Sequence, residues 1–299
     1  MKLLDSTKPA ELPTEALLAR LRSRRAEIDL LDPVATESTE ATEATVWIYQ
    51  RLNKRLRRRL EPFFELLAMR NLTLQLRYLL AGELPATILN NSLLAKPLRQ
   101  LLANSGENQA LIAQLEAALV SDYPFSFGLT VTYREQGPGG VERQLADGML
   151  VDALKRSRNV PLKRTLVYLI DMRNCLMLSR LWRWQVKQPP ALTGGGNLDR
   201  NNLQRIWARH DSERLTCLAE RLTGESLRNS KMDGGVTIGM EQAFLRGLTR
   251  LLRRLGRDPL GLAVIIEYLW RVELAVHNQL LRKTLSDDRD ALLEEVLLL

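Results

Sequence analysis

The sequence contains few of the residues that build metal centres or disulfide frameworks. Its 299 residues include two cysteines, Cys175 and Cys217, and two histidines, and no Cys-x-x-Cys pair occurs. So few residues cannot supply an ordinary Cys/His zinc site, and a disulfide scaffold is excluded in so long and apolar a chain. Cys175 lies in an apolar run and is expected to be a small core residue. We therefore predict no metal site.

Long apolar runs are also missing. The longest stretch without Asp, Glu, Lys or Arg covers residues 84–95, far short of the ~20 residues of a membrane-spanning helix. The N-terminal sequence MKLLDSTKPAELP lacks the apolar core of a signal peptide. These features predict a cytoplasmic protein whose contact with a membrane is peripheral.

Acidic residues are outnumbered by basic ones. The chain carries 43 Lys and Arg against 35 Asp and Glu, a formal charge of +8. Most of the basic residues are arginines, which pair bidentately with carboxylates or phosphates. Nucleic acid, anionic lipid and an acidic protein partner would all suit this charge, and the charge does not choose among them.

The densest basic segment is RLNKRLRRR, residues 51–59. Leucines interrupt it at helical spacing, so the basic residues lie on the outer face of an amphipathic helix. This face is either an anion-binding surface or a solvated face paired with acids elsewhere, and the spacing favours the second interpretation.

Aromatic residues make up only 5% of the chain, whereas leucine is the most frequent residue, and this composition favours helices. Apolar residues recur at three- and four-residue spacing over most of the sequence. Proline and glycine separate the resulting segments, and we expect one helical segment to begin at Pro62. The predicted helices cover residues 14–30, 45–60, 63–83, 93–102, 109–120, 149–158, 162–186, 203–222, 240–255 and 261–284.

Two segments interrupt this pattern. ATESTEATEAT, residues 35–45, is an acidic, Thr-rich stretch that we interpret as a flexible linker. Residues 127–148 combine a short alternation with a Gly-Pro-Gly-Gly turn, which predicts a short hairpin or an extended loop. The expected fold class is all-α apart from this hairpin.

An internal repeat is the most informative feature of the sequence. Residues 67–71, LAMRN, recur as residues 170–174, IDMRN, and a weaker third copy covers residues 265–285. The polar members are Arg70, Asn71 and Arg77 in the first copy, Asp171, Arg173, Asn174 and Arg180 in the second, and Glu273, Asn278 and Arg282 in the third. Polar groups in such apolar helices must find partners. They either form internal salt bridges that fix the register of three similar helical units or line a polar funnel that grips another protein.

The three copies, in order, resemble the C subunit of the V/A-type rotary ATPases, which is the counterpart of the d subunit of eukaryotic V-ATPases. The resemblance is carried by FELLAMRNLTLQLRYLLAGE (64–83), ADGMLVDALKRSRNVPLKRTLVYLIDMRNCLMLSR (146–180) and GLAVIIEYLWRVELAVHNQLLRKTL (261–285). Two departures are visible, because Ala68 stands where the family has an acid and the third copy lacks Arg-Asn.

The resemblance implies a funnel-like single domain over residues 1–299 with three pseudo-symmetric units at about 45–120, 145–225 and 240–285. It also implies a non-catalytic subunit that joins the central-stalk rotor subunits to the membrane proteolipid ring. Such a subunit transmits torque between ATP synthesis or hydrolysis and the transport of protons or sodium ions. It would have no small-molecule substrate and no nucleic acid partner.

Two other classes of function fit parts of the sequence. A basic helical nucleic-acid-binding protein is suggested by Arg51–Arg59 and by Trp182-Arg183-Trp184, although no recognised nucleic-acid module is present. An enzyme could use the acids Asp171, Glu267 and Glu273 or the two histidines, His210 and His277, but no nucleophile, metal set or cofactor loop accompanies them. TGGGN, residues 193–197, lacks the Lys-Ser/Thr of a P-loop and is interpreted as a loop.

Overall fold

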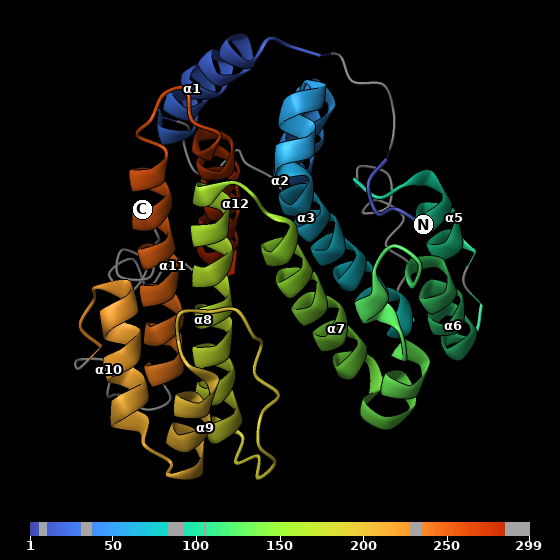
Figure 1. The fold of residues 1–299 in the computed structure, drawn as a ribbon, viewed down its shortest axis with the longest axis vertical. Helices are drawn as coiled ribbons and strands as arrows, with labels where there is room; N and C mark the ends of the chain where they lie inside the picture. The colour runs from blue at the N-terminus through green and yellow to red at the C-terminus, as the bar shows by residue number, and fades with distance from the viewer. Residues whose placement is uncertain (6–10, 31–37, 83–92, 105, 228–234, 285–299) are drawn as a thin grey trace. The chain divides into compact units, whose positions relative to one another are not determined.

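The computed structural model describes residues 1–5, 11–30, 38–82, 93–104, 106–227 and 235–284 (Figure 1). Within these ranges the regular structure is helical and contains no strand, apart from an isolated bridge between Leu4 and Leu94. This confirms the all-α fold class. The chain forms two compact units, one of Met1–Leu17 and Thr42–Arg158, the other of Leu18–Ala41 and Asn159–Leu299.

The first unit is built around a pair of long helices. α3 (Lys54–Leu80) packs against α7 (Leu129–Arg156), and α6 (Asn108–Leu119) packs against α7 and α5 (Lys96–Ala103). A short 3₁₀ turn, η1 (Pro124–Ser126), leads into α7. The core residues are Leu60, Phe64, Met69, Leu72 and Leu76 of α3 with Leu111, Leu115, Leu145 and Met149 of its neighbours.

We expected a new helix to begin at Pro62, but the boundary between two helices lies earlier, at Asn53. α2 (Ser38–Arg51) ends there, and the side-chain oxygen of Asn53 accepts from the backbone N–H of Leu56 at 2.9 Å, which caps α3. Pro62 lies inside α3 and is buried. The buried stripe continues on both sides of it, through Leu60 and Phe64, and this packing outweighs the hydrogen bond that proline cannot make.

The hairpin predicted near 127–148 was wrong, because these residues belong to the approach to α7 and to α7 itself. The Glu116 carboxylate accepts from the backbone N–H groups of Gly128 at 2.7 Å and Thr130 at 2.8 Å and so starts the helix. Gly137 is the only non-helical residue within α7 (φ 67°, ψ −164°). The helix resumes at Pro138, since proline is well suited to a first turn.

The segment interpreted as a linker, residues 35–45, is helical from Ser38 onward, and residues 35–37 lie outside the described ranges. α2 therefore begins about two turns before the predicted start near Thr45. Alanine and glutamate, which alternate with threonine here, are good helix formers, and their propensity prevails over the low complexity of the sequence.

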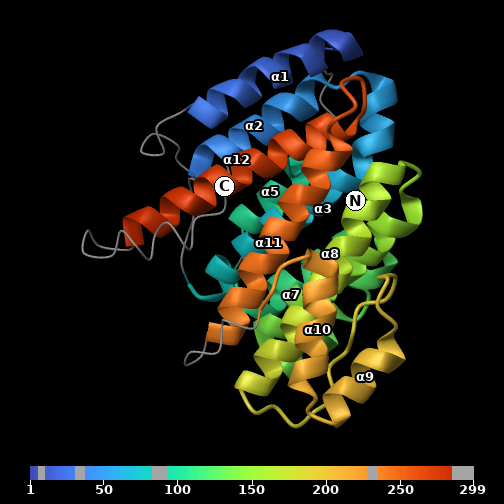
Figure 2. The same ribbon diagram turned by 90° about the vertical axis from the view of Figure 1, so that its left-hand side faces the viewer.

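The second unit consists of most of α1 (Thr14–Leu30) together with the helices that follow Asn159. α11 (Gly235–Leu255) packs against α8 (Val160–Arg183), α10 (Ser212–Thr223) and α12 (Ala263–Thr284), and α9 (Arg200–Ala208) packs against α10 (Figures 1 and 2). The single helix predicted over 203–222 is two helices. His210 adopts positive φ (50°) between them, and Asp211 caps α10.

Candidate functional site

The polar residues of the second repeat copy hold a loop. Asn174, buried on α8, exchanges two hydrogen bonds of 2.9 Å with the backbone N–H and C=O of Thr193. One helical turn earlier, the buried Asp171 carboxylate accepts from the backbone N–H groups of Asn197 and Leu198, both at 3.0 Å. The two side chains thus attach both ends of the TGGGN loop to α8.

Gly196 permits this close approach, because a Cβ at that position would collide with the Asp171 carboxylate. Burial raises the pKa of Asp171, and the two backbone N–H groups act in the opposite direction. One turn further on, burial raises the pKa of the Cys175 thiol to about 12, so it is a neutral thiol near pH 7. The cluster is therefore suited to binding its own loop, and it carries no activated nucleophile.

One arginine in each of the first two copies joins its helix to a neighbouring helix. Arg77 of α3 donates two hydrogen bonds to the Glu142 carboxylate on α7, at 2.6 and 3.0 Å. Arg180 of α8 pairs with Glu241 on α11 at 3.0 Å. Arg77 and Arg180 occupy equivalent positions in the two repeat copies. Each arginine joins its helix to an acid on a neighbouring helix of the same unit.

The remaining repeat residues do not occupy equivalent environments in the first two copies. Arg70 is exposed, while Asn71 and Arg173 are partly exposed. Ala68, which occupies the position of Asp171 in the first copy, is buried and apolar, so the first copy has no equivalent acceptor for a loop. The common role of the repeat residues stays a prediction.

In the third copy, Glu273 lies partly exposed on α12, and the side chains of Asn278 and Arg282 lie outside the described part of the structure. The buried acid of this helix is Glu267. It pairs with Arg25 of α1 at 3.0 Å and with Arg271 at 2.9 Å, all within the second unit.

Sequence reasoning missed a third buried carboxylate, Glu65 of α3. It accepts from the Tyr123 hydroxyl at 2.7 Å and from Arg156 of α7 at 2.5 Å, and Arg156 also pairs with Asp152. Burial raises the pKa of Glu65, and its two hydrogen bonds act in the opposite direction. An acid in an otherwise apolar run, FFELLA, was the available sign of this network.

The basic segment 51–59 divides into two groups. Arg51 and Arg57 lie 4.3 Å from the ring centroids of Trp47 and Tyr49 and donate to backbone carbonyls. Arg55, Arg58 and Arg59 are exposed and have no ion-pair partner among the described residues. Two arginines of the segment thus serve the fold, and the other three are open to a partner.

Two further properties narrow the class of protein. No helix within the described ranges is long and apolar enough to cross a membrane. The same ranges contain no cluster of three His, Cys, Asp or Glu side chains that could hold a metal ion. The structure is that of a helical, arginine-rich protein whose buried polar side chains bind other parts of the same chain.

The family follows from comparison with known proteins. A family model described as ATP synthase (C/AC39) subunit matches residues 45–278, and the chain belongs to this family. The match spans all three repeat copies up to Asn278 and confirms the resemblance to the C subunit of V/A-type ATPases. No curated protein matches the sequence.

Proposed function

We propose that this protein is a non-catalytic rotor subunit of a V/A-type ATPase, which joins the central stalk to the proteolipid ring on the cytoplasmic side of the membrane. The observation that carries the proposal is the family match over residues 45–278. In this role it transmits torque between the ATP-processing head and ion transport and needs no cofactor of its own.

A coupling element must resist deformation, and the interior of each unit supports this. In the first unit, the long helices α3 and α7 are packed through fully buried leucines and a phenylalanine, and close-packed protein interiors transmit strain. Interhelical ion pairs such as Arg77–Glu142 add contacts outside the apolar core. The Arg77 side chain is exposed, so this pair contributes at most about 1 kcal/mol, and the apolar packing supplies most of the stiffness.

The exposed arginines of α3 provide a surface for acidic partners. Arg55, Arg58 and Arg59 present three unpaired cations within two turns of one helix. Contacts of this kind set association rate and partner choice, and salt weakens them. We infer that this surface contributes to binding within the ATPase.

The test is a pull-down of the tagged protein from its native membranes in mild detergent, with partners identified by mass. Recovery of head, central-stalk and proteolipid subunits in one particle is the expected result. A variant with Arg55→Glu, Arg58→Glu and Arg59→Glu should lose partners. The matched control reverses Arg20, Arg134 and Arg143, which are equally exposed. Recovery of unrelated soluble proteins without any ATPase subunit would overturn the proposal.

The nucleic-acid-binding alternative makes a different prediction for the same experiment. It is favoured by the exposed arginines of α3 and by Trp184, which is 67% exposed at the end of α8. However, Trp182 stacks on Trp207 with ring centroids 5.8 Å apart, so one of the two tryptophans is engaged within the fold. Nucleic acid that co-purifies at low salt and is lost steeply as salt rises, without ATPase subunits, would establish this alternative.

A further inference from the structure

The second unit contains a cavity of about 1000 Å³ whose walls are basic. It lies among α8, α10 and α11, and its cations come from all three helices and from the turn after α11. They are Lys163, Arg164, Arg221, Arg250, Arg253, Arg254 and Arg257. None of the described residues that line the cavity is acidic.

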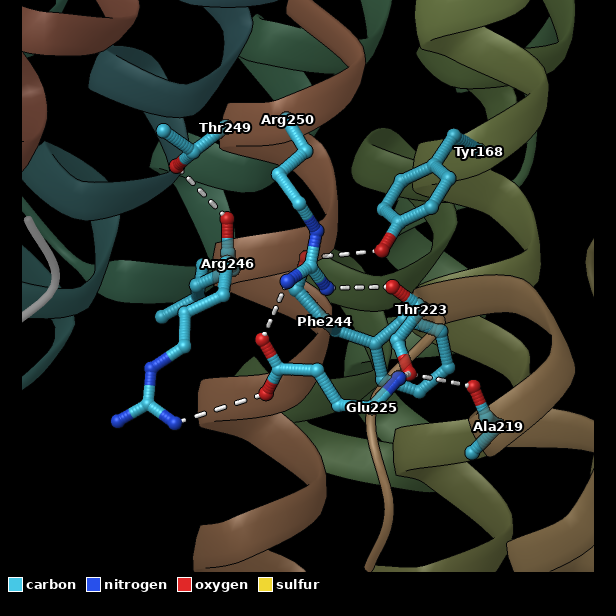
Figure 3. A network of polar contacts seen from close by, with 9 residues as sticks. Tyr168, Ala219, Thr223, Glu225, Phe244, Arg246, Thr249 and Arg250 are labelled. Carbon is cyan, nitrogen blue, oxygen red and sulfur yellow. Dashed lines mark hydrogen bonds and ion pairs between the residues drawn. The ribbon is translucent and has the colours of Figure 1, made fainter.

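A hydrogen-bonded network fixes one wall of this cavity (Figure 3). The Tyr168 hydroxyl donates to the Phe244 carbonyl at 2.9 Å, and burial raises the pKa of this tyrosine, which keeps the hydroxyl neutral. Arg250 donates to the Thr223 carbonyl at 2.5 Å and pairs with Glu225 at 2.8 Å. Gly247 lets α11 approach Tyr168 closely, because a Cβ there would collide with the hydroxyl oxygen.

Six of the seven cations are left without an acid. Glu225, the acid nearest the network in Figure 3, pairs with Arg250 and, at 3.5 Å, with Arg246. Within the described part of the chain, no ion pair or hydrogen bond engages the side chains of the other six lining cations. The lining of the cavity therefore concentrates unpaired positive charge.

A neighbouring smaller cavity of the same unit shows the contrasting arrangement. It is also lined by arginines, but the buried Glu267 stands among them and pairs with Arg25 and Arg271. The protein thus places its own buried acid in the lining of the smaller cavity. The larger cavity shares Arg253 and Arg257 with it but has no acid in its own lining.

The position of two cations on α8 has no local advantage. Lys163 and Arg164 lie at the N-terminal end of this helix, which has no acid in its first turn. Positive charge is unfavourable there because it faces the positive end of the helix dipole. Arg253 and Arg254, in contrast, lie in the last turn of α11, where cations are favourable. The helix dipole therefore accounts for the arginines of α11 but not for Lys163 and Arg164.

We propose that this cavity binds a small anion with two or more adjacent phosphate groups. Arginine predominates among the unpaired cations, and its planar fork matches phosphate oxygens bidentately. Cations on three helices surround one concavity, which suits several charges on one compact ligand, and the volume lies at the upper end of the range for small-ligand sites. The ligand could be a free polyphosphate or nucleotide, or the headgroup of a phosphorylated lipid. This proposal stands independently of the coupling role.

The test is calorimetric titration of the full-length protein with inorganic tripolyphosphate at physiological salt, with sulfate as the single-anion comparison. The pocket variant carries Arg164→Gln and Arg254→Gln, and the control variant carries Arg134→Gln and Arg143→Gln on α7. Both variants lose two exposed, unpaired arginines, so they share the same change of net charge. We expect tripolyphosphate to bind the wild type and the control equally, within about twofold. The pocket variant should bind at least about tenfold more weakly, the loss expected for one charged hydrogen bond.

A vesicle arm distinguishes the source of the phosphates. Phosphatidylcholine vesicles containing a bis-phosphorylated phosphoinositide are compared with vesicles whose equal surface charge comes from phosphatidylserine. If the protein binds the phosphoinositide vesicles and tripolyphosphate displaces it from them, the ligand is a lipid headgroup. If it binds free tripolyphosphate but not these vesicles, the ligand is soluble.

Three results would overturn the proposal. The first is an absence of tripolyphosphate binding by folded wild-type protein. The second is an equal loss in both variants, which would mean general charge attraction. The third is tighter binding of sulfate, or of an acidic poly-glutamate peptide, than of tripolyphosphate. Tighter binding of the peptide would assign the cavity to an acidic protein segment.

Discussion

At the scale of single residues, buried acceptors determine the position of the loop after α8. Asp171→Ala would leave the backbone N–H groups of Asn197 and Leu198 without their acceptor. Each unsatisfied group costs about 1–3 kcal/mol, so for two groups we expect the free energy of unfolding to fall by about 2–6 kcal/mol. Urea unfolding measures the loss, and hydrogen exchange should show faster exchange of these two amides. Glu135→Ala, at an exposed position, is the control and should stay within about 0.5 kcal/mol.

The raised pKa of Asp171 predicts a pH dependence that can be isolated by comparison with Asp171→Asn. A carboxyl whose pKa is higher in the folded protein binds its proton more tightly there than in the unfolded chain. Its contribution to stability is therefore full below the ordinary value of 3.8 and declines as pH rises through the raised pKa. The asparagine variant does not titrate at this position. We expect the stability of the wild type relative to this variant to increase as pH falls, measured by urea unfolding across this range. A relative stability that decreases on acidification would contradict the desolvation argument.

At the scale of elements, Asn53 separates two helices that a continuous apolar stripe would join. Its side chain caps α3 and donates to the Thr14 hydroxyl at 2.9 Å. Asn53→Ala should reduce the free energy of unfolding by about 1–2 kcal/mol, while Asn53→Asp keeps a capping oxygen and should cost less. Chemical denaturation of the three proteins measures the series. Equal losses in both variants would assign the effect to the Thr14 contact instead of the cap.

The same elements show how far the sequence predicts the fold. The apolar periodicity identified most of the helical regions, including α3 and α8 with their repeat residues. It failed where a side chain distant in sequence decides the outcome, as Glu116 does for the start of α7. The repeat directed attention to Asp171 and Asn174, but their partner loop could not be derived from spacing. The buried Glu65 network depends on Arg156, ninety-one positions away, so the acid in the run FFELLA could not reveal its partner.

At the scale of the whole molecule, the chain belongs to the ATP synthase (C/AC39) subunit family. The property to measure is therefore the coupling of ATP hydrolysis to ion transport. If the protein joins stalk to ring, a complex assembled without it should retain ATP hydrolysis by the head and lose ATP-driven ion transport. Adding back the wild-type protein should restore transport, because it closes the mechanical connection without contributing to chemistry.

The add-back experiment also separates coupling from assembly. The variant with Arg55→Glu, Arg58→Glu and Arg59→Glu should restore transport only at higher protein concentration. Raised salt should likewise increase the concentration of wild-type protein that restores transport. The control with Arg20, Arg134 and Arg143 reversed carries the same change of net charge and should behave as the wild type. Transport is followed with an ion-sensitive dye in proteoliposomes, and hydrolysis is followed in the same samples. Ion transport that continues at full rate without this chain would refute the coupling role, because torque would then reach the ring by another route.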